Sequence, residues 1–234
     1  MSRYSDLEDM LVTVAQALGD ELLQQVVFVG GCTTGLLVTD AVTQESIRYT
    51  EDVDLITRVM GYPQWVSFQQ RLKARGFTIS PEDEVICRMR LGELKVDFMP
   101  DDETILGFSN RWYSDALEQA QPTQLSNGTA IRLISPCHFM ATKLEAYLGR
   151  GNDDPLASHD IEDLLNIVDG REALLAELTQ ASTALKAYIA AQLESLLALS
   201  DFDYAVQTAA SNNTGREKII FARLEALAAL NSSV

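Results

Sequence analysis

The segment EDVDLITRV, residues 51–59, places two aspartates inside an apolar run that otherwise has the character of a buried strand. Successive side chains of a strand point to opposite faces, so Asp52 and Asp54 would share one face. The apolar residues between and after them would share the other face. Because aspartate is disfavoured in strands, this pattern predicts a sheet with a buried face and a carboxylate-bearing face.

Apolar spacing divides the first 134 residues into helices and strands. The expected helices cover 5–18, 33–39, 63–75 and 111–120. The expected strands cover 25–30, 51–59 and 129–136, and a hairpin over 84–100 turns around Gly92. Residues 40–49, DAVTQESIRY, are expected to form an exposed loop.

The character of the chain changes after Pro136. Five later segments have apolar residues at three- and four-residue spacing, which is typical of helices. These segments are 138–151, 158–170, 172–180, 182–200 and 217–230. We therefore expect an α/β (α+β) domain at residues 1–134, with a mixed sheet flanked by helices, and a helical bundle at residues 135–234.

The chain is strongly acidic, with 34 acidic and 18 basic residues and a formal net charge of −16. Nucleic-acid-binding surfaces are usually basic, so this charge argues against non-specific electrostatic binding of RNA or DNA. A small anionic substrate can still bind if divalent cations mediate the contact.

Cysteine usage and hydropathy bear on the cellular setting. Cys32, Cys87 and Cys137 are odd in number and form no CxxC, so a disulfide framework is not expected. The start, MSRYSDLEDM, lacks the basic and apolar blocks of a signal peptide. No apolar run reaches the roughly 20 residues that cross a membrane. These features favour a reduced, cytoplasmic setting without membrane association.

A third aspartate, Asp97, lies in the strand-like segment LKVDFMP between apolar neighbours. It is expected to leave its strand on the same face as Asp52 and Asp54. Three converging carboxylates repel one another, so bound cations would stabilise them. Oxygen ligands of this kind suit Mg²⁺ or Mn²⁺, although a lone D-x-D pair is common in strands that bind no metal.

Gly30 and Gly31 lie where the first strand is expected to pass into a helix. Backbone without a β-carbon can approach a phosphate closely, and a helix N-terminus offers free N–H groups to it. Paired glycines also end strands for purely geometric reasons. The pair gains significance because an acidic strand follows it.

Together these segments resemble the nucleotidyltransferase superfamily, the DNA polymerase β-like group. The segments VFVGGCTTGLL, IRYTEDVDLI and ELKVDFMP are most similar to the AbiEii-type nucleotidyltransferase toxins of abortive-infection and toxin–antitoxin systems. That group also has a helical Lys, a nearby Arg and a following D..D pattern, which Lys143, Arg150, Asp160 and Asp163 match. The resemblance spans about residues 25–170.

The resemblance implies a two-metal site and a nucleotide site. Asp52 and Asp54 would bind both metal ions, Mg²⁺ or Mn²⁺, and Asp97 would bind the ion that activates the attacking hydroxyl. The implied nucleotide-binding residues are Gly30, Gly31, Cys32, Thr33, Arg48, Thr50, Lys143 and Asp160.

Within that set, the glycines and the position of Cys32 would hold the β- and γ-phosphates. Lys143 would contact the triphosphate, with a solvated helix lysine as the plain alternative. Asp160 would orient Lys143 or act in catalysis, and both remain open. Arg48 and Thr50 would support the turn or the phosphates.

Three features depart from the family pattern or allow two interpretations. The usual serine after the glycines is Cys32, a weaker hydrogen-bond donor, so Thr33 or Thr34 would have to supply a hydroxyl. The connection to Asp52 carries an extra loop over residues 40–46. Arg88 and Arg90, with Lys95 opposite, indicate either an anion-binding patch or charge pairing with neighbouring acids.

Two function classes follow from this sequence. The first is an enzyme that transfers a nucleoside monophosphate from an NTP to a hydroxyl of RNA, protein or a small molecule, as a toxin–antitoxin or phage-defence component. The second is a catalytically weak binding module with the same fold, such as an antitoxin or partner subunit.

Overall fold

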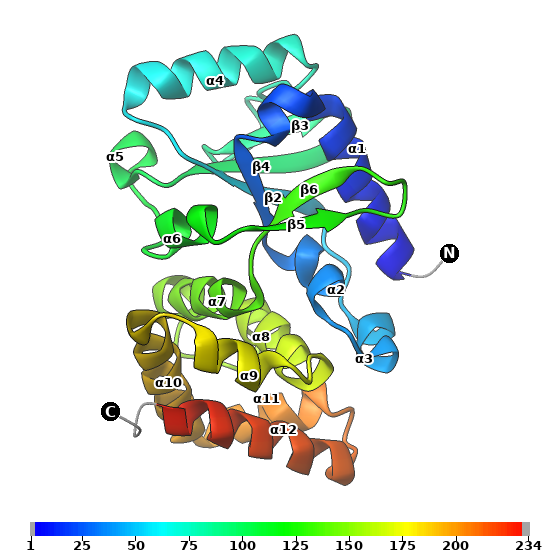
Figure 1. Cartoon of the computed structure of the whole chain (residues 1–234), viewed down its shortest axis with the longest axis vertical. Coiled ribbons are helices and arrows are strands. Elements are labelled where there is room, and N and C mark those ends of the chain that lie inside the picture. The colour runs from blue at the N-terminus through cyan, green and yellow to red at the C-terminus, as the bar shows by residue number, and fades with distance from the viewer. Residues whose placement is uncertain (1–2, 231–234) are drawn as a thin grey trace. The chain divides into compact units, whose positions relative to one another are not determined.

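The computed structural model describes residues 3–230 and is mixed α/β (Figure 1). Its contacts divide the chain into two compact units. The first contains the residues up to Thr33 and Arg48–Ser135, and the second contains Thr34–Ile47 and the residues from Pro136 onward. The expected boundary at 134/135 lies next to one of these divisions, and the assignment of Thr34–Ile47 to the second unit was not expected.

The first unit is built on a six-stranded mixed sheet with the order β3-β4-β2-β1-β6-β5. The strands are β1 (Val26–Val29), β2 (Asp52–Thr57), β3 (Arg88–Leu91), β4 (Leu94–Pro100), β5 (Gln121–Gln124) and β6 (Ala130–Leu133). The β2–β4 and β1–β6 pairs are parallel, and the other neighbours are antiparallel. The predicted strands and hairpin are confirmed, whereas β5 was not predicted.

The helices of the first unit cover apolar sheet residues. They are α1 (Arg3–Leu23), α4 (Tyr62–Ala74), α5 (Glu103–Leu106) and α6 (Tyr113–Glu118). Helix α1 is interrupted at Gly19, whose φ is +64°, where the sequence predicted its end. On β4, Phe98 meets Phe68 of α4 and Phe77 edge-on, at ring centroid distances of 5.8 and 5.4 Å. This aromatic cluster fixes which face of β4 is buried.

The second unit is helical among the residues described. Its helices are α2 (Thr34–Leu37), α3 (Ala41–Ser46), α7 (Pro136–Arg150), α8 (His159–Gly170), α9 (Leu174–Gln180), α10 (Thr183–Leu197), α11 (Ser200–Ala209) and α12 (Thr214–Ala228). Side-chain caps begin three of the long helices, at Ser158, Ser182 and Asn213. The five predicted C-terminal helices are confirmed, and α11 was not predicted.

The expectation of a loop over residues 40–49 was wrong, because residues 41–46 form α3. Asp40 caps this helix by accepting a hydrogen bond from the Thr43 amide at 2.8 Å. The amides of Thr39 and Asp40 both donate to the Gly170 carbonyl at 2.9 Å. A β-carbon on Gly170 would lie 2.5 Å from Val38 Cγ1, so only glycine allows this approach. The segment is therefore anchored to the end of α8.

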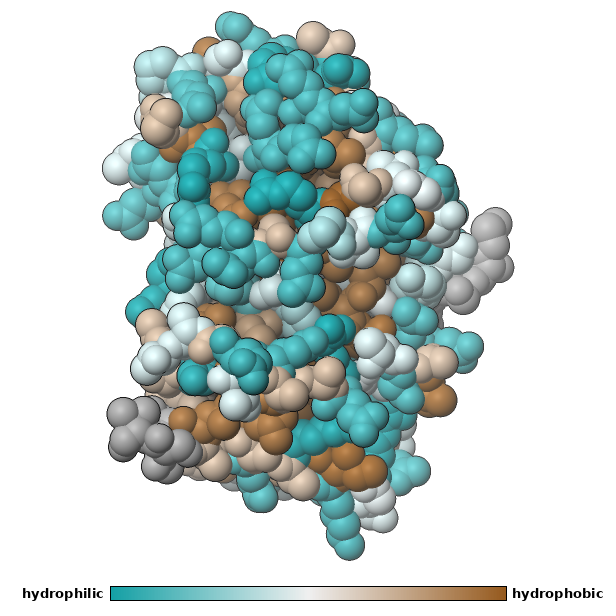
Figure 2. All heavy atoms as spheres, in the orientation of Figure 1, coloured by the Kyte–Doolittle hydropathy of each residue, from teal (hydrophilic) through white to brown (hydrophobic). Residues whose placement is uncertain are grey.

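On the face seen in Figure 2, polar side chains cover most of the first unit, whereas apolar and polar side chains are interspersed over the helical unit. The most exposed large apolar side chains include Val42, Met60, Tyr62 and Leu148. Between residues 3 and 230, we find no helix with the length and apolarity that crossing a membrane requires.

Candidate functional site

The acidic residues of β2 and β4 meet on one face of the first unit's sheet. The two strands are parallel and in register, with Asp54 opposite Asp97 and Leu55 opposite Phe98. Since side chains alternate along a strand, Asp52, two residues before Asp54, lies on the same face. We call these three carboxylates the acid face. Their predicted placement on one face is confirmed, while their role as metal ligands stays a prediction.

Arg88 on β3 bridges two members of the acid face. Its Nε and Nη2 donate to Asp97 Oδ1 and Oδ2, both at 2.8 Å. Its Nη2 also donates to Asp52 Oδ2 at 3.0 Å. The hydrogen bonds to Asp97, together with the charges of Asp97 and Asp52, raise the pKa of the already basic guanidinium. The side chain is mostly buried, so Arg88 is an integral cation of this face.

The neighbouring basic residues also have acidic partners. Arg90 makes a two-pronged ion pair with Asp83, with both hydrogen bonds at 2.8 Å. The Nζ of Lys95 lies 2.8 Å from Oε2 of Glu51. Charge pairing, one of the two interpretations of this basic cluster, is therefore confirmed for Arg88, Arg90 and Lys95.

Gly30 is fitted against the acid face at the end of β1. Its φ is +73°, a left-handed conformation that non-glycine residues rarely adopt. A β-carbon there would lie 1.8 Å from Asp54 Oδ2 and 2.6 Å from Asp54 Cβ. Backbone and carboxylate can approach this closely only because residue 30 is glycine. The paired glycines and the D-x-D strand, separate motifs in the sequence, are thus in direct contact in the fold.

The turn after Gly30 is tighter than the predicted helix start. Gly31–Thr33 form a 3₁₀ turn, η1, and α2 adds only Thr34–Leu37. The amide and hydroxyl of Thr33 donate to the Gly30 carbonyl at 3.1 and 2.8 Å. The Thr34 hydroxyl is buried and makes no hydrogen bond with the described residues. Of these two hydroxyls, therefore, that of Thr33 is already engaged in holding the turn.

The Cys32 side chain belongs to the core. Its Sγ lies 3.5 Å from the Leu7 carbonyl oxygen of α1, and the residue is 2% exposed. Burial, followed by the charge of Asp54, raises the pKa of the thiol. Any contact between this position and a phosphate would consequently come from the backbone.

Arg48 and Thr50 precede the acidic strand. Thr50 is buried, and its hydroxyl donates to the Asp52 carbonyl at 3.3 Å, so it supports the start of β2. Arg48 is partly buried two residues earlier. A phosphate contact from either residue stays a prediction.

Lys143, Arg150, Asp160 and Asp163 form a second charged cluster, entirely within the helical unit. Lys143 Nζ lies 2.7 Å from Asp163 Oδ2 and 3.2 Å from Asp160 Oδ1. Lys143 is 8% exposed, so the alternative of a solvated helix lysine was wrong. The four positions that the family resemblance singled out are thus brought together, with the ammonium held between two carboxylates.

Asp160 also receives a two-pronged hydrogen bond from Arg150, with both distances at 2.9 Å. Burial alone would raise the pKa of Asp160, but the hydrogen bond from Arg150 and the charge of Lys143 outweigh it. The pKa of Asp160 therefore lies below its usual value. Of the two roles left open for Asp160, holding Lys143 is the one its contacts support.

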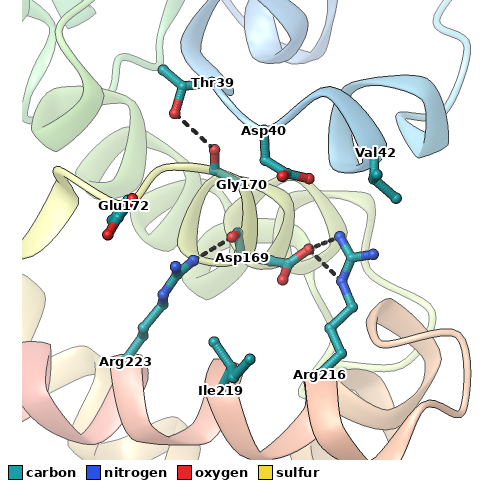
Figure 3. Close-up of a pocket in the computed structure, with 9 residues that line it drawn as sticks. All are labelled: Thr39, Asp40, Val42, Asp169, Gly170, Glu172, Arg216, Ile219 and Arg223. Carbon is teal, nitrogen blue, oxygen red and sulfur yellow. Dashed lines mark hydrogen bonds and ion pairs between the residues drawn. The ribbon is translucent and has the colours of Figure 1, made fainter.

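A cavity of about 440 Å³ lies elsewhere in the helical unit, beside the end of α8 (Figure 3). Arg216 reaches into it from α12 and pairs with Asp169, and it donates to Thr43 Oγ1 at 2.7 Å. Arg223 donates to the Val168 and Asp169 carbonyls at the end of the same helix. Both arginines are thus engaged in fastening α3 and α12 to α8.

Across residues 3–230, no three acidic, histidine or cysteine side chains are arranged as a ready metal-binding group. On the acid face, the Arg88 guanidinium engages both Asp52 and Asp97. The donor set consists of carboxylates, which suit hard cations such as Mg²⁺ and Mn²⁺. Carboxylates are thus the right type of ligand for such an ion, but in this conformation Arg88 already engages two of the three.

Neither the protein-family models nor the curated proteins compared with this chain give a match. The functional argument therefore depends on the geometry of the chain itself.

The sequence alone indicates Arg88 only as a member of a basic cluster, whereas the structure places it on the acid face. Its position opposite Asp97 follows from the hairpin register, in which Leu91 pairs with Leu94 across the turn. Counting back from that pair places residue 88 opposite residue 97. The signal was present in the sequence once the turn was located.

Proposed function

We propose that this protein is a metal-dependent nucleotidyltransferase that moves a nucleoside monophosphate from an NTP to an acceptor hydroxyl. The observation that carries the proposal is the packing of Gly30 against Asp54, with Asp97 in register beside it. A backbone able to approach phosphate thus lies directly against carboxylates able to hold cations. Such a pairing suits phosphoryl transfer, in which both phosphate and cation must be positioned.

In this proposal Asp52, Asp54 and Asp97 hold Mg²⁺ or Mn²⁺. When bound, two such ions neutralise charge on the transferred phosphoryl group and activate the attacking hydroxyl. Gly30 and Gly31 present backbone to the phosphates, and the buried Cys32 and Thr33 side chains keep that backbone in place. The protein's contribution is positioning and charge, without a covalent intermediate.

Lys143 is the proposed triphosphate contact, supported by Asp160. In that role its ammonium would exchange a carboxylate partner for a phosphate oxygen, as a flexible point charge can do. The acceptor is an RNA end, a protein side chain or a small molecule. A cytoplasmic toxin–antitoxin or phage-defence role belongs to the same proposal.

The test is to incubate the protein with each labelled NTP, Mg²⁺ and cell extract, and to follow transfer of label to an acceptor. We expect Asp54→Asn to reduce transfer by at least about a hundred-fold, because a charge that holds cations is lost. Asp83→Asn is the matched control, since Asp83 pairs with Arg90 and lies outside the acid face. Equal labelling by wild type and Asp54→Asn would refute the proposal.

A second function is favoured by one specific observation, the engagement of Asp52 and Asp97 by Arg88. An acid face partly neutralised by its own arginine suits a binding module, such as an antitoxin or partner subunit, that needs no metal. Calorimetry with an NTP, in the presence and absence of Mg²⁺, separates the two. Heat of binding that requires Mg²⁺ supports the enzyme, and its absence supports the module.

A further inference from the structure

The arrangement around Arg88 bears on how the acid face is regulated, and this inference rests on the proposed metal-dependent function. Both oxygens of Asp97 and one oxygen of Asp52 accept hydrogen bonds from a single guanidinium. A planar guanidinium matches carboxylates with a fixed fork of donors, which an ammonium cannot reproduce. Arg88 thus satisfies the same oxygens that a divalent cation would use.

We propose that Arg88 is a built-in competitor of divalent cations, so that a metal ion binds the acid face only when Arg88 leaves Asp52 and Asp97. Two positive groups cannot share the same carboxylate oxygens at ion-pair distance without strong repulsion. The affinity of the face for metal is therefore set by the strength of the Arg88 ion pairs as well as by the carboxylates.

The position of Arg88 in the fold permits such an exchange. It lies on β3, an edge strand that pairs with β4 on one side. Its side chain keeps 15% of its surface exposed, and Asp52 keeps 35%. The buried Met89 next to it anchors the strand on the opposite face, so the arginine can change rotamer while the backbone stays in place.

Arg90 provides an internal control for this inference. It lies two residues along the same strand and donates two hydrogen bonds to the Asp83 carboxylate, both at 2.8 Å. Its partner is outside the acid face. Removing either arginine deletes one guanidinium from β3, but only removal of Arg88 frees carboxylates of the acid face.

The experiment titrates Mn²⁺ alone into wild type, Arg88→Gln and Arg90→Gln, and measures the dissociation constant by calorimetry. We expect Arg88→Gln to bind Mn²⁺ about ten- to a hundred-fold more tightly than wild type, which corresponds to loss of a charged hydrogen-bonded competitor. Arg90→Gln should match wild type. Adding Asp97→Asn to Arg88→Gln should abolish the gain, which locates the ion on the acid face.

Arg88→Lys keeps the positive charge but loses the planar pair of guanidinium donors. This variant replaces Arg88→Gln in the experiment if the glutamine variant does not fold. It should bind Mn²⁺ with an affinity between those of wild type and Arg88→Gln. If wild type binds Mn²⁺ as tightly as the folded Arg88 variants, the competition is refuted and the metal-dependent function stands. If no variant binds Mn²⁺ on the acid face, both the inference and the proposed function fall.

Discussion

The acid face with Arg88 and the cluster around Lys143 contain similar charged groups but balance them differently. In the helical unit, the carboxylates of Asp160 and Asp163 face the cations of Lys143 and Arg150, two against two. On the acid face, three carboxylates lie on one side of a sheet, and a single guanidinium bridges two of them.

That difference determines how readily each cluster could accept another cation. A buried ion pair whose charges cancel resists change, because removing one partner leaves an uncompensated charge. A face with excess negative charge has capacity for a further cation. This difference favours a stabilising role for the first cluster, in addition to the triphosphate contact proposed for Lys143, and it agrees with the cation binding proposed for the acid face.

The largest expected effect is on the helical cluster. Lys143→Met should lower the free energy of unfolding by about 3–5 kcal/mol, because Asp163, which is 0% exposed, would keep a charge without its 2.7 Å partner. Urea unfolding measures this loss. Lys95→Met is the control, since it removes only a solvent-screened ion pair with the exposed Glu51 and should lower the free energy of unfolding much less. Similar losses for both variants would contradict the structural role assigned to the cluster.

The next largest effect concerns the contact between Gly30 and Asp54 of the acid face. Gly30→Ala should lower the free energy of unfolding by about 2–4 kcal/mol, because its β-carbon would collide with Asp54 in a left-handed conformation.

Gly92→Ala separates the two causes. Gly92 has a φ of +61° with open space around it, so this variant carries the backbone cost of about 1 kcal/mol without the collision. Thermal unfolding of the two variants gives the comparison. If Gly92→Ala costs as much as Gly30→Ala, contact with Asp54 is not the reason for glycine at residue 30.

A smaller effect concerns pH. The pKa of Asp160 is lower in the folded protein than the value of about 3.9 in an unfolded chain. Its contribution to stability is therefore present above that unfolded value and is lost as the pH falls through the folded pKa. Urea unfolding measures the difference in free energy of unfolding between wild type and Asp160→Asn. This difference should be large at pH 7 and smaller at pH 3. A difference that increases in acid would contradict the direction of the pKa shift.

The smallest expected effect concerns Cys32. Cys32→Ser should change nucleotidyl transfer less than about two-fold and the free energy of unfolding by about 1 kcal/mol or less, because the side chain contacts Leu7 in the core and a hydroxyl can replace that weak donor. Transfer assays and urea unfolding test both values. A rise in transfer of ten-fold or more would mean that this side chain does reach the phosphates.

Much of the first unit could be predicted from the sequence because its patterns are local. The alternation of Asp52 with apolar residues fixed the face of β2, and the turn at Gly92 fixed the hairpin. The pairing of Arg88 with Asp97 follows from the same turn by counting. These features depend on strand geometry, which repeats every two residues.

Other features depend on contacts between distant segments, which spacing cannot supply. Lys143 and Asp163 lie on different helices, so burial of their ion pair follows from how α7 and α8 pack. Helix α3 is short and mostly polar, and its chief local signal was the cap at Asp40. Its other anchors, Asp169, Gly170 and Arg216, lie far along the chain.

The anchoring of Thr34–Ile47 has a consequence for the order of events during synthesis. When residue 135 has emerged from the ribosome, every strand of the sheet has been synthesised, including β2 and β4, which carry the acid face. Residues 34–47 at that moment still lack Asp169, Gly170 and Arg216, the groups that hold them in the finished protein. The connection from the glycine turn to the acidic strand is thus completed last, by residues translated more than a hundred codons later.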